Sequence, residues 1–212
     1  MKEDKSSPEI YKLLDYIHLQ LIENGLKATT MDSIASSYRI SKRTLYEIFG
    51  NKENMIEAAI NHWRGKTADH YREIFSSSDN IMEIILRCFL YNREIMAKTS
   101  LEFYRDFHEF IKKTRKNLHE KNIVFQEHLR SILQRGINEG YFRLDINLEV
   151  LPQMINIQME ALRRMEELFP EWMSPLEVYD SIITTFLRGI STEKGKETLD
   201  MILNNIGGKQ PK

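Results

Sequence analysis

Residues 29–56 read TTMDSIASSYRISKRTLYEIFGNKENMI, and this stretch decides the fold of the N-terminal part of the chain. Thr30 and Ser41 each stand at the expected start of a helix, where a side-chain hydroxyl accepts a hydrogen bond from a free backbone N–H group. Behind each of them, apolar residues recur three and four positions apart, which is typical of a helix with one buried face. Two short helices joined by a tight connection at residues 38–40 predict a helix-turn-helix.

The second of these helices has side chains that suit DNA on its exposed face. Lys42, Arg43, Thr44 and Tyr46 are expected to point outward, with the apolar side chains behind them. In a helix-turn-helix, the second helix enters the major groove with its N-terminal residues toward the base edges. The stretch therefore predicts a DNA-binding surface on this helix.

This stretch closely resembles the DNA-binding signature of the TetR family of bacterial transcriptional regulators. The resemblance rests on residues in one register: Thr30, Ile34, Ala35, Ile40, Ser41, Leu45, Tyr46, Phe49, Lys52 and Glu53. It implies that Tyr46 and Lys52 contact phosphates, helped by Thr30 at its helix start. Lys42, Arg43 and Thr44 are then the expected readers of bases, with Arg43 first among them because a guanidinium pairs bidentately with guanine.

One residue departs from the family pattern. Arg39 occupies the turn position where the family often has glycine, which accepts a positive φ angle without steric penalty. We expect either a strained turn, at a cost of about 1 kcal/mol, or a turn of another shape.

The remaining periodicity predicts an all-α protein with two functional parts. A helix-turn-helix DNA-binding domain of three helices is expected at residues 1–50, a connecting helix at 51–75, and a helical effector-binding and dimerisation domain at 76–206. A serine-rich linker is expected at 76–79. Further helices are expected at residues 81–96, 101–118, 123–137, 147–169, 174–189 and 192–205.

The family resemblance also implies partners: a double-stranded DNA operator, a second copy of the chain and a small-molecule effector. The dimer interface is expected on the helices at 147–169 and 174–189. An apolar or amphipathic effector is expected between central helices, with the contacts Tyr91, Phe103, Tyr104, Phe107, Met154 and Gln158. The connecting helix is expected to carry the signal, as the only covalent route between the domains.

Composition sets limits on the remaining possibilities. The 212 residues include 30 Lys and Arg against 31 Asp and Glu, so DNA binding must come from local charge placement. The single cysteine, Cys88, and the lack of a signal-like start predict a cytoplasmic protein without a membrane segment. The histidines lack metal-ligand spacing and no catalytic motif is visible, so neither a cofactor, a metal nor an enzyme activity is expected.

Taken together, the sequence predicts a cytoplasmic repressor that binds a palindromic operator as a dimer and is released by its ligand. Two alternatives remain open. A helical small-molecule carrier or enzyme can contain a similar bundle without binding specific DNA sequences. A nucleoid or recombinase-like protein can use the same motif without a ligand.

Overall fold

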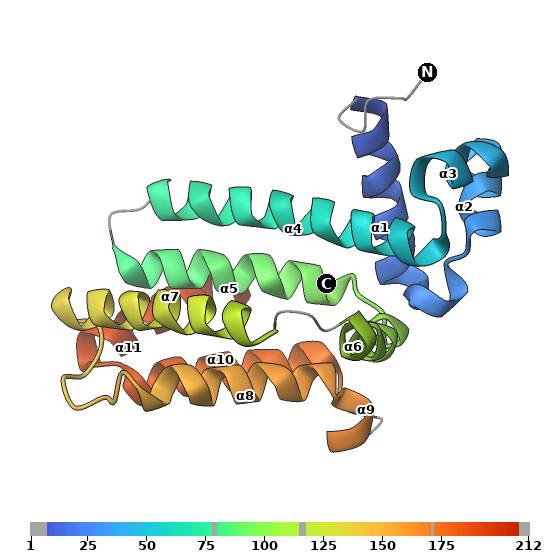
Figure 1. Ribbon diagram of the computed structural model, residues 1–212. Coiled ribbons are helices and arrows are strands. Elements are labelled where there is room, and N and C mark those ends of the chain that lie inside the picture. Colours follow the sequence, from blue (N-terminus) through green and yellow to red (C-terminus); the bar gives the residue numbers. More distant parts are fainter. Residues whose placement is uncertain (1–7, 78–79, 115–117, 171, 208–212) are drawn as a thin grey trace. The chain divides into compact units, whose positions relative to one another are not determined.

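The computed structural model describes residues 8–77, 80–114, 118–170 and 172–207, and eleven helices are found among them (Figure 1). The all-α prediction is confirmed. Of the expected linker at 76–79, Ser76 and Ser77 belong to a helix, whereas Ser78 and Asp79 lie outside the described residues. The chain divides into two compact units, which are described separately below.

The first unit contains the predicted helix-turn-helix. Its helices are α1 (Pro8–Ala28), α2 (Met31–Tyr38), α3 (Lys42–Phe49), most of α4 (Lys52–Ser77) and all but the end of α6 (Leu101–Thr114). Their apolar faces meet in one core, where Ile17, Leu21 and Leu45 are fully buried. Asn51 caps α4, since its side-chain oxygen accepts a 2.8 Å hydrogen bond from the backbone N–H of Asn54.

The position of α6 differs from the expected domain boundaries. Lys98–Lys112 clusters with the residues up to Glu73, although this segment was expected in the effector domain. The reason is its apolar stripe, because Phe103, Phe107 and Phe110 pack against the core of the first unit. The expectation of one covalent route is consequently wrong, since the chain also passes between the units after Ala97 and after Lys112.

The second unit is a bundle built around α5 (Ile81–Ala97). The other helices are α7 (Leu118–Asn138), α8 (Val150–Arg163), α9 (Met165–Leu168), α10 (Pro175–Ile190) and α11 (Glu193–Gly207). Helix α5 packs against α7, α10 and α11, and α8 runs beside α10 (Figure 1). Ile81, Met82 and Leu86 of α5 are buried, so this helix supplies much of the core.

The helix expected at 147–169 is interrupted. Helix α8 ends at Arg163, Arg164 leaves the helical region at φ −115° and ψ 32°, and the short α9 follows. Leu162 and Met165, on either side of the break, are buried in the same core. Apolar spacing therefore continues across the break, which is why periodicity predicted one helix.

The segment before α8 folds back onto the rest of the second unit. Phe142 is 1% exposed, and its ring occupies the space where a side chain on Gly136 would stand. The backbone N–H of Arg143 donates to the carbonyl of Ile190 at 2.9 Å. Asn147 then begins the approach to α8, accepting at its side-chain oxygen from the N–H of Val150 at 3.1 Å.

None of the described helices combines the length and apolar character that crossing a membrane requires. Within the same part of the chain, no three His, Cys, Asp or Glu side chains are grouped so that they can hold a metal ion.

Candidate nucleic-acid interface

Two side-chain caps fix the helix-turn-helix. Thr30 Oγ1 accepts from the Ser33 backbone N–H at 3.0 Å, and Ser33 Oγ accepts from the Thr30 N–H at 2.9 Å, which completes a capping box at α2. Ser41 Oγ accepts from the Thr44 N–H at 3.0 Å at the start of α3. Both predicted caps are confirmed, and they set where the DNA-facing helix begins.

The turn between α2 and α3 contains the strain expected at Arg39. This residue adopts φ 59° and ψ 41°, in the left-handed region, and among the described residues it is the one non-glycine with a positive φ. Its N–H still donates to the Ala35 carbonyl, so the end of α2 keeps a hydrogen bond. The glycine-type turn is thus retained with an arginine in it, at a cost of about 1 kcal/mol.

Helix α3 exposes a polar face, here named the recognition face and made of Lys42, Arg43, Tyr46 and Glu47. On the opposite side, Leu45 is fully buried and Phe49 nearly so. Tyr46 is 45% exposed, so its hydroxyl is available to a phosphate.

Both cations of the recognition face are paired with carboxylates. Lys42 Nζ lies 2.6 Å from Asp32 Oδ1 of α2, and Arg43 Nε lies 2.8 Å from Glu47 Oε1 one turn along α3. These carboxylates raise the pKa of both cations, which keeps them charged. Sequence reasoning identified the cations but missed Asp32 and Glu47; the i,i+4 spacing of Arg43 and Glu47 was the available signal.

Thr44 differs from the other expected DNA contacts on α3 because it is half-buried. Its hydroxyl lies 2.7 Å from the hydroxyl of Ser41, so the side chain takes part in the cap of α3. Thr44 is therefore placed to stabilise the start of the helix as well as to approach a base.

Lys52, the expected phosphate contact, is anchored at the start of α4. Its ammonium donates to the backbone carbonyl of Lys27 at 2.8 Å. Partial burial lowers its pKa. An ammonium has three N–H donors, so this anchor leaves Lys52 able to donate to a phosphate as well.

Lys27, whose carbonyl anchors Lys52, also takes part in a partly buried contact between α1 and α6. This contact is here named the α1–α6 joint and is made of Gly25, Lys27, Glu102 and Asp106. The Lys27 backbone N–H donates to Asp106 Oδ2 at 2.7 Å, and the Asp106 side chain is only 3% exposed. Gly25 has φ 80° and ψ 165°, and a Cβ there would lie 2.9 Å from the Cβ of Glu102. Sequence reasoning missed this contact, because nothing near Gly25 in the sequence indicates a neighbour on α6.

A histidine and a tryptophan stack inside the first unit. The rings of His18 on α1 and Trp63 on α4 lie 4.9 Å apart and nearly parallel. Burial lowers the pKa of His18 to about 4, with a smaller opposing effect from the charge of Asp15. His18 is therefore neutral at pH 7, and Trp63 is held against it.

The structure divides the expected effector contacts between the two units. Phe103 and Phe107 stack at 5.3 Å and pack against the first core, and burial raises the pKa of Tyr104 to about 12. These three side chains are in the first unit, and the two phenylalanines serve its packing. The other three are in the second unit, where Tyr91 on α5 and Gln158 on α8 are half-buried and Met154 on α8 is exposed.

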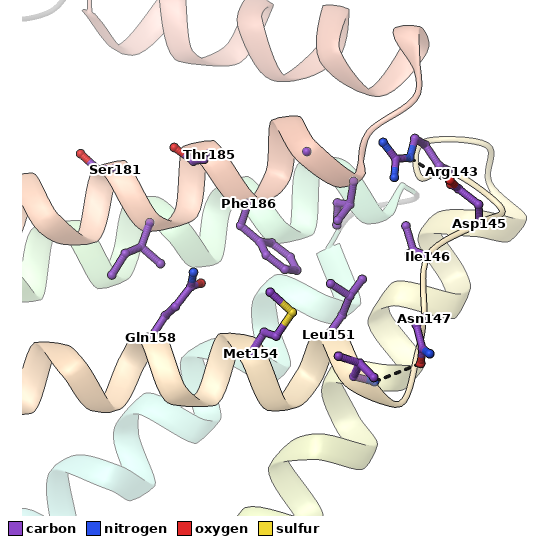
Figure 2. Close-up of a pocket in the computed structure, with 14 residues that line it drawn as sticks. Arg143, Asp145, Ile146, Asn147, Leu151, Met154, Gln158, Ser181, Thr185 and Phe186 are labelled. Carbon is purple, nitrogen blue, oxygen red and sulfur yellow. Dashed lines mark hydrogen bonds and ion pairs between the residues drawn. The ribbon is translucent and has the colours of Figure 1, made fainter.

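A groove of about 680 Å³ lies between α8 and α10 in the second unit. Figure 2 shows Met154 and Gln158 of α8 facing Phe186 of α10 across it, with Arg143 and Asp145 at one end. Val150, Met154 and Ile157 form a stripe on α8 and are 48%, 46% and 68% exposed. An apolar stripe of this kind beside a groove is typical of a surface that another protein covers.

The segment that contains the helix-turn-helix matches a known family. The family model described as "Bacterial regulatory proteins, tetR family" matches residues 13–59. The HTH-type transcriptional repressor KstR2 of Rhodococcus jostii (strain RHA1) is 29% identical over 144 residues, which are 66% of this chain and 70% of that protein. KstR2 of Mycobacterium tuberculosis (strain ATCC 25618 / H37Rv) is 26% identical over 148 residues, 68% of this chain and 74% of that protein.

Solved structures show the same fold. The structure of KstR2 of Mycobacterium tuberculosis has a TM-score of 0.58 and 24% identity, covering 86% of this chain and 94% of that chain. A transcriptional regulator from Cytophaga hutchinsonii ATCC 33406 has a TM-score of 0.63 and 21% identity, covering 88% of this chain and all 100% of that chain. Residues 13–59 are thus a TetR-family DNA-binding domain, and with repressors among its relatives the chain is a DNA-binding transcriptional regulator similar to TetR-family proteins.

Proposed function

We propose that this regulator is a homodimeric repressor that binds a palindromic operator in the cytoplasm and is released by an apolar or amphipathic small molecule. The observation that carries this proposal is the recognition face on α3, whose helix start is fixed by Ser41 and whose neighbour Lys52 is anchored at the start of α4. A face of this kind is fixed before DNA arrives, which favours sequence-specific binding over loose charge attraction.

The roles in DNA contact follow from placement. Arg43 and Lys42 are exposed on the recognition face and supply base contacts, with Thr44 behind them at the cap. Tyr46, Lys52 and the helix start at Thr30 supply phosphate contacts. Base contacts carry the sequence preference, whereas phosphate contacts set position and salt dependence.

A gel shift tests the DNA-binding proposal directly. The probe is the region upstream of the protein's own gene, titrated at several salt concentrations against an unrelated fragment of equal length. We expect a complex with the upstream region that survives competitor DNA and weakens as salt rises. Equal affinity for both fragments at every salt concentration would leave only non-specific binding and would reject the repressor.

The dimer proposal rests on the exposed stripe of α8 and the groove beside α10. Of the apolar residues on these helices, Ile155, Leu162 and Val178 are buried within the chain's own core, so they are not free to form an interface. Val150 and Ile157 are exposed instead. A second copy that covers this stripe gives the two-fold symmetry that a palindromic operator requires.

A charge on the stripe tests the interface. Ile157→Asp places a carboxylate at the 68% exposed position of the stripe, and Met201→Asp makes the same change at a 65% exposed position on α11 outside the groove. In sedimentation at micromolar concentration we expect a dimer for the unmodified protein and for Met201→Asp, and a monomer for Ile157→Asp. A monomeric unmodified protein, or two variants that behave alike, would contradict the proposed interface.

A partner on the groove changes the roles of two expected effector contacts. Met154 and Gln158 line it, so in a dimer they face the second copy. The Gln158 Oε1 atom is buried and has no hydrogen-bond partner among the described residues, so a donor from the partner would satisfy it. The effector site then involves the interior of the second unit, where Tyr91 is the remaining candidate polar contact.

The effector class is supported by a relative. The solved structure of KstR2 is described as a "ketosteroid transcriptional regulator", which names an apolar polycyclic ligand class for that protein. The second unit of this chain is likewise rich in large apolar side chains around Phe89 and Tyr179, which stack at 5.5 Å. Flexible and aromatic side chains of this kind suit an apolar effector.

Fluorescence of Trp63 tests ligand release. In a Trp172→Phe variant, Trp63 is the remaining tryptophan and reports on the first unit. The variant is titrated with ketosteroids and other hydrophobic compounds, with and without operator DNA. For tenfold release, the effector must favour the DNA-free state by about 1.4 kcal/mol, and DNA must weaken effector binding by the same factor. A compound that binds free and DNA-bound protein equally well would show that its site is not coupled to DNA.

A further inference from the structure

Counted together with Asp32 of α2, the charged side chains of the recognition face sum to zero, although the proposed partner is anionic. Lys42 is balanced by Asp32, and Arg43 is balanced by Glu47, which itself stands on the recognition face. The Glu47 side chain is 60% exposed. A carboxylate at this position is repelled by DNA phosphates and lowers affinity for DNA in general.

The geometry of the Arg43–Glu47 pair shows what the carboxylate does for recognition. Glu47 Oε1 accepts from the Nε atom of Arg43 at 2.8 Å, one helical turn away. The two terminal nitrogens of the guanidinium are not part of this bond. A guanidinium held at Nε directs these terminal N–H groups as a pair, which matches the O6 and N7 acceptors of guanine.

We propose that Glu47 is a specificity-determining residue of this regulator: it positions Arg43 for guanine, and its charge penalises sites where that guanine is absent. The inference rests on the proposed role of Arg43 as a base reader. At a correct site, the guanidinium remains bound to Glu47 and meets guanine with its terminal nitrogens. At an incorrect site, the carboxylate's repulsion from the phosphates remains, and the guanine contact that offsets it is missing.

Selection from a random double-stranded library, followed by binding measurements, tests this proposal. The unmodified protein first defines the preferred site, and Arg43→Ala identifies the base pair at which discrimination depends on Arg43. Dissociation constants are then measured for this site, for its version with that base pair replaced, and for unrelated DNA. The variants are Glu47→Ala and Glu47→Gln, and Glu57→Ala removes an exposed carboxylate of α4 as the matched control.

We expect Glu47→Ala to reduce discrimination at the Arg43-dependent base pair by roughly five- to tenfold, while affinity for unrelated DNA rises. Glu47→Gln keeps an acceptor oxygen without the charge, so its discrimination falls between that of Glu47→Ala and that of the unmodified protein. Glu57→Ala leaves discrimination unchanged. Thermal unfolding of the Glu47 variants should match that of the unmodified protein, since the ion pair is exposed.

A double variant separates positioning from direct base contact. In an Arg43→Ala background, Glu47→Ala should change discrimination at that base pair no further. If it changes discrimination as much as in the unmodified protein, Glu47 reads a base by itself and the positioning role is wrong. If the unmodified protein selects no sequence, the repressor proposal fails together with this one. If it selects a site and Glu47→Ala discriminates normally, only the role of Glu47 is rejected.

Discussion

The α1–α6 joint and the recognition face lie in the same unit and handle charge in opposite ways. In the joint, Asp106 is 3% exposed and accepts from a backbone N–H, so its carboxylate is part of the fold. On the recognition face, Arg43 is 88% exposed and pairs with another exposed side chain. Buried, backbone-anchored charge determines stability, whereas exposed ion pairs add little stability and are free to exchange partners. Within this unit, the residues that stabilise the fold therefore differ from those that are proposed to read DNA.

The largest expected effect is at Gly25 in the joint. Gly25→Ala places a Cβ at φ 80° and 2.9 Å from the Cβ of Glu102, so both the backbone and the packing must shift. We expect a loss of about 3 kcal/mol or more in the free energy of unfolding. Gly65→Ala on α4, where a Cβ meets nothing within 4 Å, should instead add about 0.5–1 kcal/mol. Urea unfolding followed by Trp63 fluorescence measures both, and equal effects would contradict the close contact.

A smaller loss is expected for the carboxylate of the joint. Asp106→Ala leaves the partly buried N–H of Lys27 without its acceptor, which should cost about 2 kcal/mol. Asp106→Asn keeps an acceptor oxygen and should lose less. Lys27→Ala removes a 73% exposed side chain but keeps the backbone N–H, so it should change stability by under about 1 kcal/mol. Equal losses for the Asp106 and Lys27 variants would mean that the side-chain ion pair, and not the backbone bond, stabilises the joint.

The buried histidine of the first unit predicts a pH dependence. The pKa of His18 is about 4 in the folded protein against the usual 6.5 for a histidine, so the unfolded chain binds more protons between these values. The contribution of neutral His18 to the free energy of unfolding is therefore fully present above pH 6.5 and is lost as the pH falls toward 4. We expect a loss of about 1.4 kcal/mol between pH 7.5 and 5.5 from this residue. His18→Phe keeps a ring against Trp63 and should flatten the profile over this range. An unchanged slope in that variant would assign the dependence to other groups.

The smallest expected effect is at the turn of the helix-turn-helix. Arg39→Gly relieves the φ of 59° but adds backbone freedom to the unfolded chain, so we expect a net gain of about 0.5 kcal/mol. Ser36→Gly, at an exposed position in the middle of α2, should lose about 0.5 kcal/mol in the free energy of unfolding. Glycine there adds backbone freedom to the unfolded chain and relieves no strained φ angle. A loss in both variants would mean that the arginine side chain stabilises the turn.

The sequence predicted the structure correctly where that structure depends on residues close together in the chain. Caps at Thr30 and Ser41, the left-handed residue at Arg39 and the helix-turn-helix register all arise from short-range rules. These rules determine which backbone groups lack partners and which φ angles are allowed. This part of the candidate site was therefore predictable, including its exposed cations.

Long-range partners were not predictable in the same way. The spacing of Phe103 and Phe107 showed that α6 has a buried face but not that this face packs against the helix-turn-helix unit. The buried role of Asp106 depends on that same placement, because its acceptor meets a backbone N–H 79 residues away in sequence. Periodicity identifies an apolar face, and tertiary structure decides what covers it.

Arg43 is proposed to read a base, whereas Lys52 is proposed to contact the DNA backbone. The most direct test measures the affinity of the unmodified protein, Arg43→Ala and Lys52→Ala for the selected operator and for each of its single-base variants at several salt concentrations. We expect Arg43→Ala to lose about 1–3 kcal/mol of discrimination at one base pair and to change the order of preferred sequences. Lys52→Ala should weaken binding to all of them alike and reduce the salt slope by roughly one. If both variants lower affinity by the same factor on every operator variant, the division between base reading and backbone contact is wrong.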